Sequence, residues 1–309
     1  MSEPGATDMS VTVGSLTLAS AVMTASGTSG HGAELGAYMD LSRLGAVVVK
    51  SLMADPWPGN AAPRVAPVRA GMLNSVGLQG PGIAAWREQE LPELVATGAT
   101  VVLSIWGRHV EDYAAAAEAV APIGDEVAAV EVNLSCPNLD GGSHLFAHDP
   151  EDAAAVMGAT APCGRPRWAK LSANTDRIVD VAAAVAGAGA EAVTLVNTLK
   201  AMAIDVETAR PVLGAGGGGL LGAAIHPVAV RAVHDVRAAL AEVPIIGVGG
   251  VVDAIDAVEM IMAGADAVQV GTASFADPRA ADAVRTGLEH WCRQHGTAAV
   301  KDLKGRAHG

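Results

Sequence analysis

Short continuous runs of apolar residues recur along the chain, and segments with helical spacing separate most of them. Continuous rather than alternating runs are typical of parallel strands that are buried on both faces. We expect eight such strands, at 21–25, 46–49, 101–105, 127–132, 168–171, 192–196, 245–248 and 267–270. Helices are predicted at 33–41, 110–120, from 150, at 178–188, 227–240, from 253 and at 277–295.

This alternation predicts an α/β fold, a single (β/α)8 TIM barrel that spans residues 1–309 as one domain. Residues 11–18 predict a small N-terminal β-hairpin that closes one end. Two long βα loops, 51–80 and the segment after 196 that runs to 222, are expected over the C-terminal face, because loops of this length commonly bind ligands. A doubly wound open sheet is the alternative, but the GxGxxG turn that it favours is absent after the first strand.

Two of the five lysines, Lys50 and Lys170, end predicted buried strands. In such barrels the carboxyl ends of the strands carry the active site. A buried lysine needs an anion close by, which points to a charged site. The alternative for each lysine alone is a side chain that reaches from the barrel rim into solvent.

Asparagines follow the same strand ends. Asn133 and Asn197 end strands, Asn138 comes shortly after Asn133, and Asn74 lies within the first long loop. An amide side chain offers two donors and an acceptor, so several that converge suit a planar ligand with carboxylate, carbonyl and N–H groups. Taken singly, each asparagine is equally typical of a turn or a cap.

Cys136 lies in a polar loop directly after the strand at 127–132. Pro137 keeps the preceding residue extended, and this placement favours a working thiol, a general base, over a cysteine that only packs. Cys163 and Cys292 fall in or after predicted helices and are expected to be inert. The histidines are scattered along the chain, and no metal site is predicted.

Glycine-rich turns follow the last two strands, at 247–250 and at Gly271-Thr272. Barrels often bind phosphate there through backbone N–H groups, and glycine allows a close approach. Gly222 precedes a predicted helix and is a further donor candidate. Plain tight turns are the alternative.

The net charge of −13 argues against nucleic-acid or anionic-membrane partners, which bind clustered lysine and arginine. No apolar run approaches the roughly 18 residues of a membrane span. Residues 1–10 lack an apolar signal core, and three widely spaced cysteines give no disulfide framework. We therefore expect a soluble, cytoplasmic protein.

Seven stretches together resemble dihydroorotate dehydrogenases of the soluble class 1 type, from about Val11 to Trp291. They are AVMTASGTSG, VVVKS, NSVGLQGPG, EVNLSCPN, VNTLKAMAID, IIGVGGV and MIMAGADAVQVGTA. GNAAPRV and NLDGGSHLFAHDP are most similar to subclass 1B, which passes electrons to NAD through a partner subunit. The resemblance implies FMN across the barrel mouth and oxidation of (S)-dihydroorotate to orotate in de novo pyrimidine (UMP) biosynthesis.

The resemblance also implies roles for individual residues. Cys136 would take a proton from C5, while hydride passes from C6 to flavin N5. Lys50 would act beside both flavin and substrate. The substrate residues would be Lys50, Asn74, Ser75, Val76, Gly77, Leu78, Asn133, Asn138, Asn197 and Thr198. The flavin residues would be Ser26, Lys50, Ser51, Ser104, Asn133, Lys170, Val196, Gly222, Gly249, Gly250, Gly271 and Thr272.

A few positions depart from the family pattern. Ser104 stands where many members have Asn, Leu221 where Ser is usual, and Ala223 and His226 are atypical. They keep open two alternatives: an FMN barrel enzyme for another cyclic amide of the dihydropyrimidine type, or a silent paralogue that serves as a binding subunit. The expected assembly is a homodimer, or a heterotetramer with a subunit that carries FAD and [2Fe–2S].

Overall fold

The computed structural model describes residues 7–135 and 145–309. All eight predicted strands are confirmed and form one parallel sheet, in the order β3-β16-β15-β10-β9-β8-β7-β4. Backbone bonds from Gly45 N to Val22 O (2.8 Å) and from Thr24 N to Ala46 O (3.2 Å) join the two ends, so the sheet curls into a nearly closed barrel. The strands are β3 (Val22–Thr24), β4 (Val47–Val48), β7 (Val101–Ile105), β8 (Ala129–Asn133), β9 (Arg167–Lys170), β10 (Ala192–Leu195), β15 (Ile245–Val248) and β16 (Ala267–Val270).

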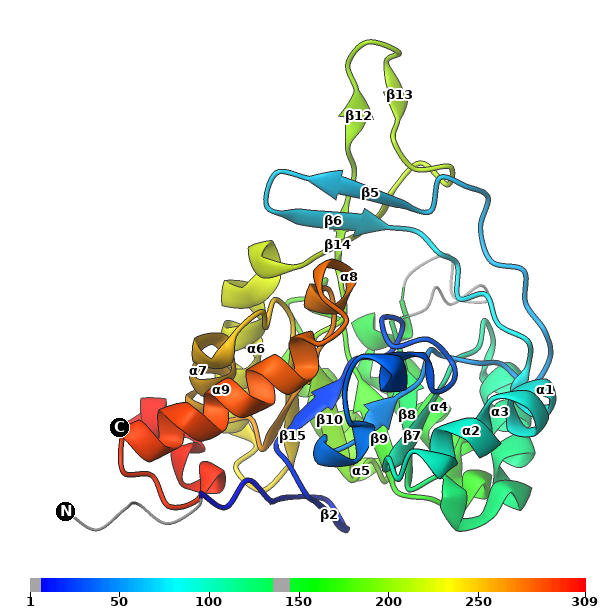
Figure 1. Cartoon of the computed structure of the whole chain (residues 1–309). Coiled ribbons are helices and arrows are strands. Elements are labelled where there is room, and N and C mark those ends of the chain that lie inside the picture. The colour runs from blue at the N-terminus through cyan, green and yellow to red at the C-terminus, as the bar shows by residue number, and fades with distance from the viewer. Residues whose placement is uncertain (1–6, 136–144) are drawn as a thin grey trace.

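Helices surround the barrel (Figure 1). Six of the seven predicted helices are found: α3 (Val110–Val120), α4 (Pro150–Ala159), α5 (Ile178–Gly187), α6 (His226–Ala239), α7 (Ala254–Met262) and α9 (Ala280–Gln294). Asp149 and Asp253 accept hydrogen bonds from the first free N–H groups of α4 and α7, which explains where these two helices begin. Three further helices were not predicted: α1 (Ile83–Gln89), α2 (Leu91–Ala96) and α8 (Ala273–Ala276).

The expected helix at 33–41 is wrong. This segment forms only short 3-10 turns, at Glu34–Ala37 and then at Leu41–Arg43. Asp40 lies between them in an extended conformation and accepts a hydrogen bond from Ser42 N (3.0 Å). An aspartate side chain that accepts from a backbone N–H two residues later competes with a continuous helix. The first turn therefore ends before Asp40, and the second begins after it.

The two long loops are not structureless, which corrects the prediction. They contribute β5 (Val65–Val68), β6 (Gly71–Asn74), β11 (Leu199–Ala201) and β14 (Gly218–Leu221) to an antiparallel sheet of order β11-β14-β6-β5. This lid sheet lies over one end of the barrel, and the hairpin of β12 (Ile204–Asp205) and β13 (Arg210–Pro211) projects beyond it (Figure 1). The glycine run 216–219, interpreted as a loop, therefore includes the first half of a strand.

The predicted N-terminal hairpin is confirmed as β1 (Val11–Val13) and β2 (Leu16–Leu18), with Gly14 at a positive φ of 60° in the turn. Ser15 N donates to Glu191 Oε2 (2.8 Å), and Glu191 directly precedes β10. The hairpin thus covers the amino ends of the strands, and the carboxyl ends lie under the lid sheet. In the described part of the chain, no helix is long and apolar enough to cross a membrane.

Candidate active site

A cavity opens at the carboxyl ends of the barrel strands, beneath the lid sheet. Most of the predicted site residues line it, although they come from segments that lie up to about 250 residues apart. The predicted residues that line it are Ser26, Lys50, Ser51, Asn74, Val76, Gly77, Leu78, Asn133, Lys170, Val196, Asn197, Thr198, Gly249, Gly250, Gly271 and Thr272. The barrel therefore brings these residues together at the carboxyl ends of its strands, where the sequence predicted the site.

A second cavity adjoins the first. Asn74, Thr198 and the segment 76–78 line both, so the two are continuous. Within that segment Gly77 and Leu78 have positive φ values of 72° and 57°. A Cβ on Gly77 would lie 2.5 Å from Asn60 N, so only glycine fits this turn. The first long loop thus supplies a tightly held backbone strip between the two cavities.

Sequence reasoning missed the aromatic and cationic lining of the second cavity. The rings of Trp57 and Trp106 pack edge to face with centroids 5.9 Å apart, and the guanidinium of Arg108 lies 4.7 Å from the Trp57 ring. Lys200 and Asn174 also line this cavity. The tryptophan in the first long loop was the available signal, because large aromatic side chains in a loop are typical of a covered pocket.

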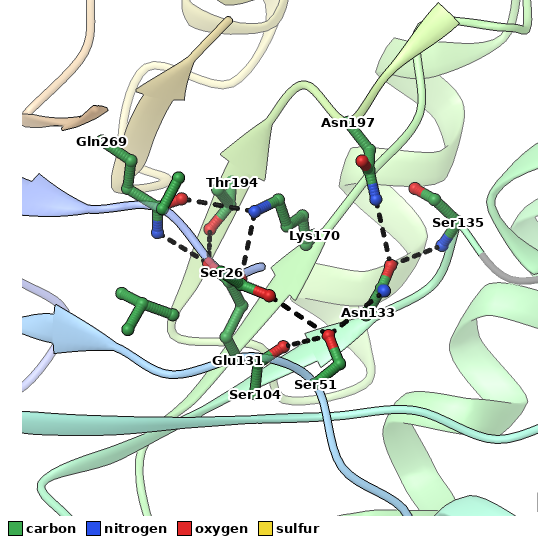
Figure 2. Close-up of polar contacts among 12 residues, drawn as sticks. Ser26, Ser51, Ser104, Glu131, Asn133, Ser135, Lys170, Thr194, Asn197 and Gln269 are labelled. Carbon is green, nitrogen blue, oxygen red and sulfur yellow. Dashed lines mark hydrogen bonds and ion pairs between the residues drawn. The ribbon is translucent and has the colours of Figure 1, made fainter. Parts of the chain in front are cut away.

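A chain of polar side chains crosses the floor of the first cavity (Figure 2). Asn197 Nδ2 donates to Asn133 Oδ1 (3.2 Å), and Asn133 Nδ2 donates to Ser51 Oγ (3.4 Å). Ser135 N and Thr198 N donate to the side-chain oxygens of Asn133 and Asn197, respectively. These contacts set which end of each amide is oxygen and which is nitrogen. The site therefore presents two asparagines in defined orientations.

Ser51 also joins the hydroxyls of Ser26 (3.2 Å) and Ser104 (2.8 Å). Ser104 is fully buried and does not line the cavity, so it lies behind Ser51. The serine that stands at position 104 in place of the family's asparagine therefore affects the support of Ser51 and not the cavity wall itself.

Lys170 belongs to a buried network inside the barrel, which we call the interior network: Lys170, Glu131, Thr194 and Gln269 (Figure 2). Lys170 Nζ lies 3.2 Å from Glu131 Oε1 and 3.3 Å from Gln269 Oε1. Glu131 Oε2 accepts from Gln269 Nε2 (2.7 Å) and from Thr194 Oγ1 (3.3 Å). The anion that a buried lysine requires is thus Glu131, which sequence reasoning missed. A glutamate inside an apolar strand run was the signal for it.

Lys50 lines the same cavity, yet no side chain in the described ranges accepts a hydrogen bond from its ammonium or forms an ion pair with it. Burial lowers the pKa of Lys50, and the positive charge of Arg64 lowers it further. A cation held in this way favours an anionic ligand, because the ligand would supply the missing counter-charge.

Backbone amides at the glycine turns fit a phosphate. Within residues 7–135 and 145–309, no hydrogen bond is found for the N–H groups of Gly249, Gly250, Gly271 and Thr272, all at the cavity wall. Gly249 and Gly250 have positive φ values of 133° and 70°, and a Cβ on Gly250 would lie 2.7 Å from the His226 Cβ. Unpaired donors on a backbone without side chains are the usual means of binding phosphate in such turns.

The atypical His226 supports this turn. Its Nδ1 lies 2.9 Å from Gly249 O, and its Nε2 lies 3.2 Å from Glu259 Oε2. Leu221, the other departure beside it, lines the cavity wall. Gly222 does not line the cavity but is adjacent to the turn, since its carbonyl would lie 2.9 Å from a Cβ on Gly250.

Three predictions remain to be placed. Ser75 lines the second cavity only. Cys136 and Asn138 lie outside the described residues, so their positions stay predictions. The other two cysteines are buried, and burial raises the pKa of both Cys163 and Cys292, which makes these thiols unreactive. No group of acidic, histidine or cysteine side chains that could hold a metal is found in the described part.

Comparison with known proteins gives consistent results. The model of the family described as "Dihydroorotate dehydrogenase" matches residues 8–291. A relative from Trichlorobacter lovleyi, named "Dihydroorotate dehydrogenase B (NAD(+)), catalytic subunit", is 46% identical over 302 residues, which cover 97% of this chain and 99% of the relative. Proteins of the same name from Pelobacter propionicus (45%) and Desulforudis audaxviator (46%) each match over 299 residues, 96% of this chain and 98% and 97% of the relatives.

Proposed function

Because the chain belongs to the dihydroorotate dehydrogenase family, class 1B, we propose that it oxidises (S)-dihydroorotate to orotate in pyrimidine biosynthesis with FMN as its cofactor. The observation that carries this proposal is the cavity itself. It combines a glycine-turn anion site, the buried Lys170, the half-buried Lys50 and two oriented asparagines at the carboxyl ends of one barrel.

The flavin residues would divide the cofactor between them. Gly249, Gly250, Gly271 and Thr272 would hold the phosphate with N–H groups from which no described residue accepts a hydrogen bond. Lys170 would lie at the flavin edge where reduction builds negative charge, as the family resemblance implies. Bound FMN supplies the hydride acceptor that this reaction needs.

The substrate residues would bind an anionic ring that carries amide groups. Among the described residues no side chain is a counter-ion for Lys50, so Lys50 would favour the substrate carboxylate. Asn197 donates one Nδ2 hydrogen to Asn133, which leaves its second N–H for a ring carbonyl or the carboxylate. Asn74, Asn138 and the backbone of 76–78 would hold the remaining polar atoms, while Cys136 would remove the C5 proton. This acid–base role needs a thiolate, which the charge of Lys50 would favour.

An anaerobic bleaching experiment tests the proposal. The purified protein, loaded with FMN, should lose its yellow absorbance on addition of dihydroorotate. Dihydrouracil lacks the carboxylate and should bleach the flavin much more slowly. Bound FMN that dihydroorotate leaves oxidised would overturn the substrate assignment, and bleaching by dihydrouracil alone would favour the alternative cyclic-amide enzyme. Failure to take up FMN would favour the non-catalytic binding subunit.

We also propose an electron-transfer partner with FAD and [2Fe–2S]. The relatives are named catalytic subunits of an NAD(+) enzyme, and this chain has only three cysteines, too few for a cluster site of its own. The isolated chain should bleach with dihydroorotate but form no NADH until the partner is added. NADH formation by the isolated chain would overturn this part.

A homodimer is the second proposed association. Met202, Ile204 and Val206 on the projecting hairpin are 57%, 58% and 85% exposed, and grouped apolar side chains of this kind are typical of an interface. Val206→Asp should shift the particle mass measured by light scattering from dimer to monomer. A monomeric wild-type protein would contradict the proposal.

A further inference from the structure

The interior network separates a charged side chain of the flavin cavity from three residues that never reach the cavity. Figure 2 shows the contacts among the four side chains. Lys170 lines the cavity, whereas Glu131, Thr194 and Gln269 do not and are fully buried. These three residues come from β8, β10 and β16, so the network ties together strands from both halves of the barrel. An arrangement that places two formal charges in a barrel interior needs an explanation beyond packing.

The hydrogen bonds of the network fix how each group is oriented. Glu131 accepts with both oxygens, and Thr194 and the Gln269 amide donate to it. Gln269 can then only offer its oxygen to Lys170. The ammonium has three N–H donors, of which Glu131 and Gln269 take two, so the third is left for the cavity that Lys170 lines.

The charges of Lys170 and Glu131 cancel, but only Lys170 lies at the cavity. The positive end faces the cavity and the negative end lies behind it, so the pair carries no net charge and still presents a cation to a ligand. A negative charge that develops in the cavity would be attracted to the Lys170 ammonium, and the hydrogen bond from that ammonium to Glu131 (3.2 Å) weakens the attraction by compensating the charge of the lysine.

We propose that Glu131 is a positioning residue that holds the Lys170 ammonium at the flavin and limits the positive potential the flavin experiences. This inference rests on the proposed function only in requiring that the cavity binds a flavin. Glu131 acts through Lys170 and touches neither flavin nor substrate.

Substitution by glutamine separates charge from shape. In Glu131→Gln the new NH2 group must face a donor, either Lys170 or the Gln269 amide. If Gln269 flips to accept it, Gln269 turns its own NH2 group towards Lys170. In either case Lys170 loses one of its two acceptors, and its charge is no longer compensated.

Sulfite titration of the FMN-loaded protein is the test. Sulfite adds to oxidised flavin and leaves negative charge on the ring, so its dissociation constant reports the local potential without any substrate turnover. Glu131→Gln should bind sulfite about tenfold more tightly and should raise the midpoint potential by about 30 mV for a two-electron couple. Lys170→Met should shift both quantities in the opposite direction.

Controls identify the route of the effect. Glu118→Gln, an exposed change on α3, should leave sulfite binding unchanged, and Glu131→Asp, which keeps the charge, should stay within about threefold of wild type. In a Lys170→Met background, Glu131→Gln should change sulfite affinity less than twofold, because Glu131 acts through the lysine. This double variant lacks both charges and also tests the proposal if Glu131→Gln alone does not fold.

Three results would overturn the inference: Glu131→Gln within twofold of wild type, a shift towards weaker sulfite binding, or an undiminished Glu131 effect in the absence of Lys170. Failure of dihydroorotate to bleach the flavin would remove the proposed reaction but would leave these outcomes readable. A wild-type protein that takes up no flavin would remove both.

Discussion

Lys50 and Lys170 line one cavity but differ in what surrounds them. Lys170 has Glu131 and Gln269 within 3.3 Å, whereas the described side chains give Lys50 no counter-ion. A compensated cation can be a permanent part of the cavity wall. An uncompensated one is stabilised only when an anionic ligand arrives.

We predict that Lys50→Met stabilises the ligand-free protein and weakens ligand binding. The pKa of Lys50 is lowered in the folded state, mainly by burial, so the unfolded chain binds the proton more tightly and the wild type bears a cost. Removing the charge should therefore raise the free energy of unfolding at pH 7. The gain should shrink as pH rises from the lowered pKa towards the ordinary value of 10.5.

Urea unfolding between pH 7 and 10 measures the stability, and orotate titration of the FMN-loaded protein measures binding. Orotate affinity should fall at least about tenfold, since a hydrogen bond to a charged group is lost. A destabilised variant that binds orotate normally would contradict the assignment of Lys50 as a cation reserved for the ligand.

Cys136→Ala should keep FMN and lose flavin reduction by dihydroorotate, most of all near neutral pH. A general base contributes roughly 10²–10⁴-fold to such a step. Anaerobic stopped-flow absorbance measures the rate. Cys292→Ala is the matched control. The Cys292 thiol is buried in α9 and lines neither of the two cavities. Equal rates for wild type and Cys136→Ala would show that another group is the base.

At the scale of elements, the lid sheet positions the strip 74–78 over the barrel. β14 approaches β6 so closely that a Cβ on Gly218 would lie 2.2 Å from Asn74 O. On the side of β11, a Cβ on Gly219 would lie 2.0 Å from Oγ1 of Thr198, which directly precedes β11. Glycine in a strand often marks such a close approach of two segments. The two long loops therefore depend on each other for the shape of the second cavity.

Gly219→Ala should raise the KM for dihydroorotate by about tenfold, because the new methyl group displaces Thr198 at a proposed substrate position, and a small displacement near the reacting groups is costly. Gly217→Ala is the control: its Cβ would meet only Ala201 O, at 3.5 Å, and Met202 Cε, at 3.9 Å. Steady-state kinetics with an artificial electron acceptor measures both. Equal KM values would show that the lid sheet does not shape the substrate site.

At the scale of the molecule, the two ends of the barrel have different tasks. Asp266, at the amino end of β16, accepts from Arg237 Nη2 (2.8 Å), Ile245 N (2.8 Å) and Lys304 Nζ (2.7 Å). It thereby joins α6, β15 and the C-terminal segment at the end opposite the cavity. In barrels of this kind the amino end serves stability and the carboxyl end serves catalysis.

Asp266→Ala should therefore lower the free energy of unfolding by about 3 kcal/mol, because it leaves the buried Arg237 without its anion. The KM for dihydroorotate and FMN uptake should stay within twofold of wild type. Asp235→Ala breaks an exposed pair with Arg231 and should cost less than about 0.5 kcal/mol. Urea unfolding of the three proteins measures this, and a similar loss in both variants would contradict the division between the two ends.

The sequence alone predicted the eight barrel strands, the N-terminal hairpin and the strand-end position of most lining residues. It could do so because these features are local: an apolar run, a glycine turn, a polar residue directly after a strand. The helix predicted at 33–41 is wrong because the Asp40 side chain accepts a hydrogen bond from Ser42 N. This local bond competes with a continuous helix, and the spacing of apolar residues does not reveal it.

Only the tertiary structure decided which residues meet. Glu131 and Gln269 are 138 positions apart, and β6 pairs with β14 across more than 140, so no local pattern indicates either contact. It also decided that Ser104 bonds Ser51 from outside the cavity lining, and that Lys170 is paired with Glu131 while no described side chain pairs with Lys50. The physical reason is the same in each case. The spacing of apolar residues and their intrinsic preferences specify a strand. Which strands pair, and which buried charges such as Lys170 and Glu131 meet, follow from how the barrel closes.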